Sequence, residues 1–242
     1  MSRIYEAMKR GASLEAARRS PITAGPKGPP LVDRVAEGYQ RVLHAIQSRQ
    51  AATAKKGSVI LFVSSAHGEG TSTVARELAI LLVRDSNTHA VLVDANLRTP
   101  SQHTAFGLER AGGLSEMVLR GLAPEEVVRN GGSAPVPLVT CGRPASHPAE
   151  ILSAAGLRIA LQALRARYDW VIVDGPPATV YSDAGMLAPL VDGVVLIVEA
   201  EKTRWEVAEQ AKRTLDESGA QVLGAVLSRR QFHIPERLYG LL

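Results

Sequence analysis

A glycine-rich segment between an apolar run and a helical pattern constrains this chain more than any other feature. Residues 64–73 read Ser-Ser-Ala-His-Gly-Glu-Gly-Thr-Ser-Thr, after the apolar run 59–63 and before the alanine- and leucine-rich stretch 74–83. A strand, a glycine turn and a helix in this order form the context of a phosphate-binding loop, or P-loop. In such a loop, backbone N–H groups and the positive end of the helix dipole surround phosphate oxygens. The segment therefore predicts an α/β fold with a phosphate site at this turn.

The residues of this loop fit the P-loop pattern with one important exception. Ser72 stands where a hydroxyl ligates Mg²⁺, and the glycines allow the backbone to close around a phosphate. Thr71 stands where the pattern has the lysine that reaches the terminal phosphates, so the loop lacks its usual cation. Six residues are expected to bind the nucleotide: Gly68, Glu69, Gly70, Thr71, Ser72 and Thr73.

The composition fits one α/β domain and excludes several other classes. A chain of 242 residues can bury a full core. Its single cysteine, Cys141, excludes an internal disulfide and fits a reducing compartment. No apolar stretch approaches the roughly 20 residues of a membrane span, and the first residues lack the apolar core of a signal peptide. We therefore expect a cytoplasmic protein, and we expect no specific nucleic-acid binding because aromatic residues are few and no basic run is dense.

Positive charge is concentrated near the N-terminus. Residues 1–56 hold 11 Lys or Arg and 4 Asp or Glu, whereas the rest of the chain carries an acidic excess. Within this part, residues 2–19 show a helical pattern and residues 20–32 are rich in proline and glycine. Two readings stay open, a docking arm for an anionic surface or partner and a solvated leader.

Downstream of this leader, apolar runs alternate with helical patterns. Strands are expected at 58–64, 90–94, 136–140, 169–174, 193–198 and 222–227. Helices are expected at 33–49, 72–85, 113–120, 150–167, 182–190 and 203–218. The alternation predicts a doubly wound, mainly parallel sheet with ligands at the carboxyl ends of the strands. The expected organisation is a helical leader and linker at 1–32, a connecting helix at 33–56 and a P-loop NTPase-like domain at 57–242.

Two further apolar strands end in an aspartate. Residues 91–94 read Val-Leu-Val-Asp and continue as Ala-Asn-Leu-Arg, and residues 171–174 read Val-Ile-Val-Asp and continue as Gly-Pro-Pro. Because the carboxyl ends of parallel strands meet at one edge of the sheet, Asp94 and Asp174 should lie beside the loop, where a phosphate-bound Mg²⁺ would sit. Asp174 suits the role of holding Mg²⁺ through water while Ser72 ligates it directly.

Taken together, the three signatures resemble those of the bacterial tyrosine kinases (BY-kinases), relatives of the MinD/ParA ATPases. The family loop Gly-Glu-Gly-Lys-Ser-Thr is matched by residues 68–73, and the family signature Asp-x-Asp-x-Arg by Asp94, Asn96 and Arg98. The third signature, Asp-x-Pro-Pro, is matched by residues 174–177. The resemblance extends over nearly the whole chain, through residues 1–9, 147–152, 182–184, 191–193 and 222–227.

The resemblance implies binding of ATP or ADP with Mg²⁺. It implies that Asp94 and Asp174 are catalytic carboxylates and hold the metal together with Ser72, and that Arg98 contacts the nucleotide. It also implies a role in exopolysaccharide or capsule synthesis or export, with a transmembrane chain-length regulator or co-polymerase as partner. The chain would then be peripheral to the inner membrane through that partner, and the resemblance leaves a homo-oligomer open.

Departures from the family pattern bear on activity. Thr71 replaces the P-loop lysine, and Asn96 replaces the second aspartate of the kinase signature. Ala66 stands at the place of an additional signature lysine of MinD/ParA proteins, which BY-kinases also lack. The oligomerisation helix of the family carries Glu-x-x-Arg-x-x-Arg, where this chain has Glu37, Gln40 and Leu43. Active members end in a tyrosine cluster, whereas the tail here offers only Tyr239.

Three functional hypotheses follow. The first is a BY-kinase-like nucleotide-binding protein with a regulatory role and weak or absent kinase activity. The second is an active protein-tyrosine autokinase of the same pathway, in which Arg98, Arg76 or His67 would supply the missing charge. The third is a MinD/ParA-type positioning ATPase, against which the missing signature lysine and the Pro176-Pro177 pair count.

Overall fold

The computed structural model describes residues 31–50, 57–85, 88–130, 134–144, 146–153 and 155–229. The leader helix expected at 2–19 and the tail with Tyr239 lie outside these residues. Within the described residues, no helix is both long enough and apolar enough to cross a membrane.

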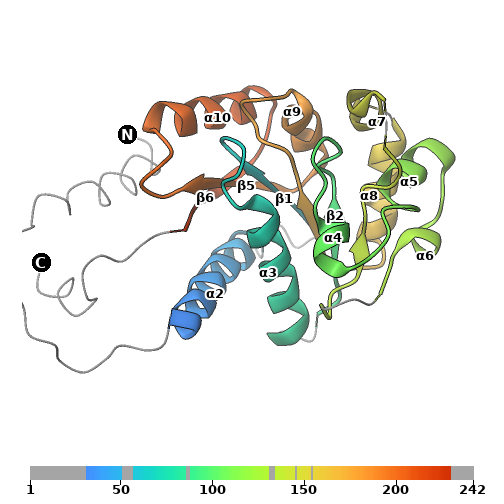
Figure 1. Cartoon of the computed structure of the whole chain (residues 1–242), viewed down its shortest axis with the longest axis horizontal. Coiled ribbons are helices and arrows are strands. Elements are labelled where there is room, and N and C mark those ends of the chain that lie inside the picture. Colours follow the sequence, from blue (N-terminus) through green and yellow to red (C-terminus); the bar gives the residue numbers. More distant parts are fainter. Residues whose placement is uncertain are drawn as a thin grey trace, which may run out of the picture.

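A parallel sheet forms the centre of the molecule (Figure 1). In the described part of the chain it has six strands in the order β3-β2-β4-β1-β5-β6. Their bounds are β1 (Ser58–Ser64), β2 (Ala90–Asp94), β3 (Leu138–Val139), β4 (Trp170–Asp174), β5 (Gly193–Glu199) and β6 (Val222–Ser228). The predicted parallel sheet is therefore confirmed, although β3 is shorter than the run of five residues expected there.

Helices cover both faces of this sheet, as the doubly wound prediction requires. They are α2 (Leu31–Gln50), α3 (Thr71–Asp85), α4 (Gln102–Phe106), α5 (Leu114–Arg120), α6 (Pro124–Val127), α7 (Pro148–Ser153), α8 (Ala155–Arg165), α9 (Asp183–Leu187) and α10 (Trp205–Glu217), with the 3₁₀ turn η3 (Ala188–Leu190). Where one helix was predicted at 150–167, the structure has α7 and α8. The short helices α4 and α6 were not predicted, because neither is long enough to show a helical repeat.

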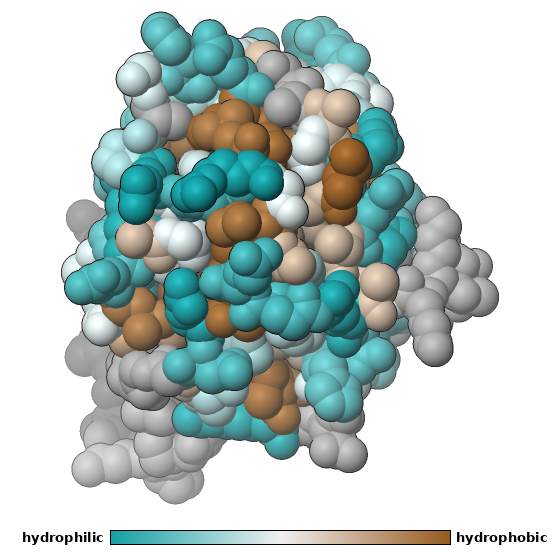
Figure 2. All heavy atoms as spheres, turned by 90° about the vertical axis from the view of Figure 1, so that its right-hand side faces the viewer, coloured by the Kyte–Doolittle hydropathy of each residue, from teal (hydrophilic) through white to brown (hydrophobic). Residues whose placement is uncertain are grey.

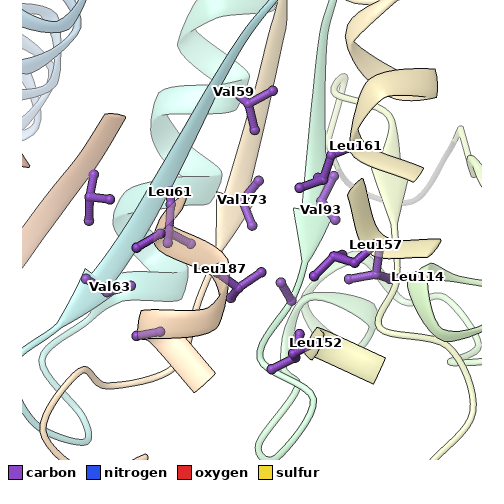
Figure 3. Packing of buried hydrophobic residues seen from close by; sticks show 14 of the residues in the cluster. Val59, Leu61, Val63, Val93, Leu114, Leu152, Leu157, Leu161, Val173 and Leu187 are labelled. Atoms are coloured by element: carbon purple, nitrogen blue, oxygen red, sulfur yellow. The ribbon is translucent and has the colours of Figure 1, made fainter. Parts of the chain in front are cut away.

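Alternate residues of β1 face two separate cores. Val59, Leu61 and Val63 pack with residues of α5 to α10 on one face, as Figure 3 shows for part of this cluster. Ile60 and Phe62 pack on the other face with residues of α2, α3 and α4. A strand that is buried on both faces needs a continuous apolar run rather than an alternating one, which is the pattern of residues 59–63. The strand that leads into the glycine loop is thereby held firmly in the sheet.

Helix α2 belongs to the second of these cores. Leu43 and Ile46 are buried in the cluster that also contains Leu78 and Leu82 of α3. Leu43 stands at the position of the last arginine in the family's oligomerisation signature. In the described structure this position packs against the core and carries no charge.

The face formed by α5 to α8 mixes polar and apolar side chains (Figure 2). Leu119 of α5 and Ile159 of α8 are its largest exposed apolar residues among those described. Hydrophilic residues separate the apolar areas in this view, an ordinary arrangement for a protein surface.

Candidate nucleotide site

The glycine loop closes at the carboxyl end of β1 and opens directly into α3. Gly68 and Gly70 have φ angles of +83° and +88°, the left-handed region that side chains disfavour. The amide of Val74 donates to the carbonyl of Gly70 at 3.0 Å, so helical hydrogen bonding begins inside the loop. Around this turn lies a cavity of about 210 Å³, lined by Ser64, residues 67–73, Asn96, Thr99, Gly175, Pro177 and Arg229. The predicted loop residues 68–73 thus all line one cavity.

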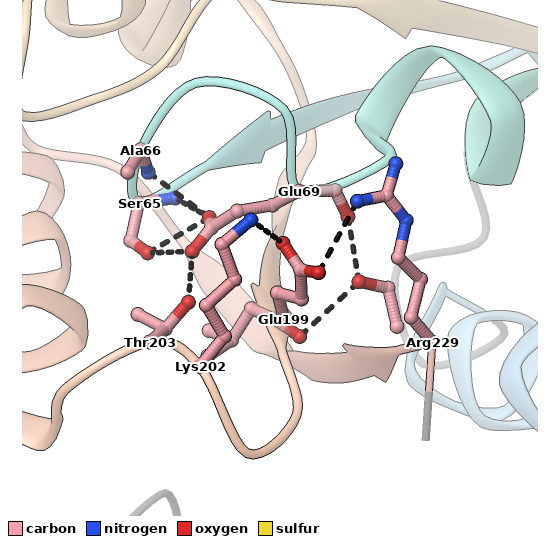
Figure 4. A network of polar contacts seen from close by, with 9 residues as sticks. Ser65, Ala66, Glu69, Glu199, Lys202, Thr203 and Arg229 are labelled. Carbon is pink, nitrogen blue, oxygen red and sulfur yellow. Dashed lines mark hydrogen bonds and ion pairs between the residues drawn. The ribbon is translucent and has the colours of Figure 1, made fainter. Parts of the chain in front are cut away.

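The Glu69 side chain holds the loop from within (Figure 4). Its carboxylate accepts hydrogen bonds from the backbone N–H groups of Ser65 and Ala66 at 2.7 and 3.0 Å. It also accepts from the hydroxyls of Ser65 and Thr203, and only 2% of the residue is exposed. The hydroxyl of Ser228 donates to the Glu69 carbonyl at 2.6 Å, which ties the end of β6 to the loop. Glu69 was predicted to bind nucleotide, and the structure gives its carboxylate a role in shaping the loop.

Thr71 presents a buried hydroxyl in place of the lysine. The residue is 7% exposed, and within the described chain its Oγ1 atom has no hydrogen-bond partner. A buried hydroxyl without a partner is unfavourable by about 1–3 kcal/mol. A phosphate oxygen in the cavity could accept a hydrogen bond from this hydroxyl. Position 71 can therefore contact an anionic ligand, although it carries no charge.

Asp94 and Asp174 lie opposite each other on the neighbouring strands β2 and β4. Both are fully buried. Asp94 accepts hydrogen bonds from the backbone of Asn96, Ser101 and Gln102 at 3.1–3.2 Å, so its carboxylate caps the start of α4. Burial and the charge of Asp174 raise the pKa of Asp94 to about 7 despite these backbone bonds. Burial also raises the pKa of Asp174 to about 6, against the opposite effects of the Ser72 hydroxyl and the Gln102 amide.

Gln102 links the aspartate pair to the loop. Its Nε2 atom donates to the Asp174 carboxylate at 2.7 Å and to the Ser72 carbonyl at 2.9 Å. Because both partners are acceptors, the amide orientation is fixed. The Gln102 Oε1 and Asp174 Oδ1 atoms are buried and without a partner in the described structure. No sequence signal singled out Gln102, since its position depends on α4, which was not predicted.

These groups fit a divalent cation held mainly by a bound nucleotide. The described residues contain no cluster of three or more His, Cys, Asp or Glu side chains that could hold a metal alone. A hydroxyl, a carboxylate oxygen without a partner and the oxygens of a phosphate chain form the oxygen-rich set that Mg²⁺ prefers, completed by water. Ser72 and Asp174 are therefore suited to hold the ion. Asp94, the third expected ligand, already accepts three backbone hydrogen bonds, and its metal role stays a prediction.

Arg98 is engaged away from the cavity lining. Its guanidinium makes two bonds to the Asp183 carboxylate, at 2.7 and 2.9 Å, and lies 4.0 Å from the ring centre of Tyr181. Asp183 is almost fully buried, so this ion pair is needed to compensate its charge. A nucleotide contact by Arg98 stays a prediction. Of the other basic residues considered, Arg76 lies beside Glu77, and its charge opposes the rise in the pKa of Asp174 that burial causes. His67 lines the cavity.

Asn96 and Arg229 complete the described cavity wall. The Asn96 side-chain carbonyl accepts from the Thr99 backbone at 3.1 Å, which fixes the turn after β2. Arg229 follows β6, and sequence analysis did not identify it. The rule that ligands lie at the carboxyl ends of parallel strands could have found it, because it comes two residues after the strand expected at 222–227.

Comparison with known proteins agrees with this architecture. The tyrosine-protein kinase YwqD of Bacillus subtilis is 33% identical over 183 residues, which cover 75% of this chain and 77% of that protein. The putative tyrosine-protein kinase CapB of Staphylococcus aureus is 26% identical over 70% of this chain and 74% of its own length. No protein-family model matches the chain.

Solved structures give the same result. The VpsO kinase domain is 28% identical, with a TM-score of 0.69 over 84% of this chain and 100% of that one. The cell division ATPase MinD of Pyrococcus furiosus shares the fold, with a TM-score of 0.60 at 21% identity over 75% of this chain and 77% of its own. By its identity to YwqD and its fold, this chain belongs to the bacterial tyrosine-protein kinase family, within the MinD-like P-loop fold.

Proposed function

We propose that this chain binds Mg²⁺-ADP or Mg²⁺-ATP and acts in exopolysaccharide or capsule synthesis or export as a regulatory protein with weak or absent kinase activity. One observation carries the proposal. The loop keeps its two left-handed glycines and its opening into α3, yet it holds the Thr71 hydroxyl where the family has a cation.

Nucleotide binding is supported by the groups that remain. The loop amides and the start of α3 favour phosphate oxygens, and the hydroxyls of Thr71 and Ser72 can add two neutral contacts. Ser72 and Asp174 would hold the cation, which supplies neutralisation of the phosphate charge when bound. Binding needs only these contacts, so it survives the loss of one charge more easily than catalysis does.

Weak catalysis is supported by the two substitutions. Phosphoryl transfer depends mostly on positioning and on stabilising the charge that develops in the transition state. Removal of a single well-placed donor in other enzymes lowers the rate by roughly 10²–10³. Thr71 removes a full cation, and the Asn96 amide that replaces a carboxylate is used to hold Thr99. We expect the combined loss to be at least as large.

The proposal includes a membrane partner. A transmembrane chain-length regulator or co-polymerase would recruit the chain to the inner membrane. The family resemblance supports this partner, and the positive excess of residues 1–56 would favour an acidic partner or an anionic surface.

Two measurements test the proposal together. Calorimetry with Mg²⁺-ADP should show saturable binding at micromolar to submillimolar concentration, and Ser72→Ala should weaken the Mg²⁺-dependent part of it. Autophosphorylation with labelled ATP should be undetectable or very slow, whereas Thr71→Lys combined with Asn96→Asp should raise ATP turnover. Absence of binding at millimolar nucleotide would contradict the proposal.

An active autokinase is the second candidate. The 33% identity to a protein named as a tyrosine-protein kinase favours it. Phosphotyrosine that forms in the unaltered protein and disappears in Asp174→Asn would establish this candidate in place of the first.

A further inference from the structure

The described cavity has one Lys or Arg side chain in its wall, and it comes from outside the glycine loop. Arg229 lines the cavity together with residues 67–73. Arg98 is paired with Asp183, and Arg76 lies beside Glu77. Among the described Lys and Arg side chains, Arg229 is therefore the one in the cavity wall, and the loop offers no cation at position 71. Arg76 acts from α3 on Asp174, where its charge opposes the rise in pKa that burial causes.

The end of β6 fixes Arg229 beside the loop. The preceding residue, Ser228, donates its hydroxyl to the carbonyl of Glu69 at 2.6 Å. Its side chain also lies close to Gly70, where an added Cβ would be 3.9 Å from the Ser228 Cβ. Arg229 itself has a φ of 52°, the left-handed conformation that is uncommon for residues other than glycine and asparagine. The backbone thus turns sharply at this position, directly next to the loop.

The present partner of Arg229 can release it at little cost. Glu199, at the end of β5, binds Arg229 through one carboxylate oxygen at 3.2 Å and Lys202 through the other at 2.9 Å (Figure 4). If Arg229 moved away, the ion pair between Lys202 and Glu199 would remain, so the negative charge of Glu199 would still be compensated. The Arg229 side chain is 57% exposed, and an exposed ion pair of this kind is weak.

We propose that Arg229 binds the phosphates of the nucleotide and supplies the positive charge that position 71 lacks. The assignment rests on the proposed nucleotide binding. A guanidinium can donate two parallel hydrogen bonds to phosphate oxygens, which makes it a strong phosphate ligand even from a flexible side chain. On binding, Arg229 exchanges the Glu199 carboxylate for the phosphate chain while Lys202 keeps Glu199.

Substitutions at two positions test this assignment. Arg229→Asn removes the charge and suits the left-handed backbone, so the variant should fold, with a melting temperature close to that of the unaltered protein. Arg229→Lys keeps the charge. Arg213→Gln is the matched control, because Arg213 of α10 also forms an exposed ion pair, with Glu209, but is absent from the described cavity lining. ADP, AMP and adenosine are titrated into each protein by calorimetry.

We expect Arg229→Asn to weaken ADP binding by about tenfold, the effect of one charge-assisted contact. The loss should be smaller for AMP and absent for adenosine. Arg229→Lys should recover part of the ADP affinity, because lysine keeps the charge but not the two parallel hydrogen bonds, and Arg213→Gln should leave the affinity within about twofold.

Three results would overturn the assignment. If the Arg229→Asn variant and the unaltered protein bound ADP with equal affinity, the role assigned to Arg229 would be wrong and the proposed function would still stand. Equal losses for ADP and adenosine would assign Arg229 to the base instead of the phosphates. Absence of ADP binding to the unaltered protein would remove the proposed function and this assignment together.

Discussion

Asp94 and Asp174 face each other in register at the ends of β2 and β4, and neither carboxylate is exposed to solvent. The two carboxylates differ in their hydrogen bonds. Asp94 accepts from two backbone N–H groups at the start of α4 and from that of Asn96, whereas Asp174 keeps one oxygen without a partner among the described residues. Two equivalent strand-end aspartates in the sequence thus have different surroundings in the fold, and Asp174 is the one with an oxygen left for a cation.

This pair should make the metal-free protein less stable as the pH rises. Burial raises the pKa of Asp94 to about 7 and that of Asp174 to about 6, both above the ordinary value of 3.8. Between these limits the folded state holds protons that the unfolded chain releases, so the free energy of unfolding falls with rising pH. The slope is at most about 1.4 kcal/mol per pH unit for each proton held.

Asp174→Asn isolates this contribution, because its amide oxygen can still accept from Gln102. Its free energy of unfolding relative to the unaltered protein should increase between pH 5 and pH 8, measured by urea denaturation in EDTA. A difference that is independent of pH would show that the pair does not carry raised pKa values.

Substitution of Glu69 should loosen the loop. Glu69→Gln replaces one acceptor oxygen by an NH₂ group that faces N–H and O–H donors, which leaves buried donors without partners. We expect a loss of about 1–3 kcal/mol in the free energy of unfolding and faster hydrogen exchange at the amides of Ser65 and Ala66. Thr203→Val removes only one of the contacts and should have a smaller effect. Unchanged exchange in Glu69→Gln would contradict the role assigned to this carboxylate.

Most of the fold was predictable because its signals are local. Most strands are continuous apolar runs because they are buried on both faces, although β6 is partly exposed. Five of the six strands appear within a residue of their expected ends. The helices α4 and α6 span five and four residues, too short for a helical repeat to be visible. The start of α4 is instead set by a carboxylate from β2, a contact that only the folded chain creates.

The site, like the fold, was predictable where its signals are local in sequence. The residues of the glycine loop and the strand-end aspartates have signals within a few positions in sequence, and the structure brings them together. Gln102 and Arg229 reach the loop from α4 and from beyond β6, so their positions depend on the strand order and on side-chain contacts. The sequence did not indicate the ion pair of Arg98 with Asp183, and the nucleotide contact that the family position suggested for Arg98 stays a prediction.

Removal of the Arg98 charge should act mainly on stability. Arg98→Met leaves the buried Asp183 carboxylate unpaired, and we expect a loss of about 3 kcal/mol in the free energy of unfolding. Asp183→Asn in the same chain should recover part of this loss, because an amide carries no charge to compensate. ADP affinity, measured well below the melting temperature, separates the two roles. A large loss of affinity without a loss of stability would establish the nucleotide contact instead.

Thr71 should show opposite effects on stability and on binding. Thr71→Val keeps the shape of the side chain and removes a buried hydroxyl that has no partner in the described structure. The free energy of unfolding of the nucleotide-free protein should therefore rise by about 1 kcal/mol. Affinity for ADP should fall several-fold, since a contact to phosphate is lost, and Thr71→Ser should keep that affinity. Urea denaturation and calorimetry on the same preparations check both effects. A decrease in stability would mean that the hydroxyl is already satisfied in the free protein, and an unchanged affinity would mean that it does not face the phosphates.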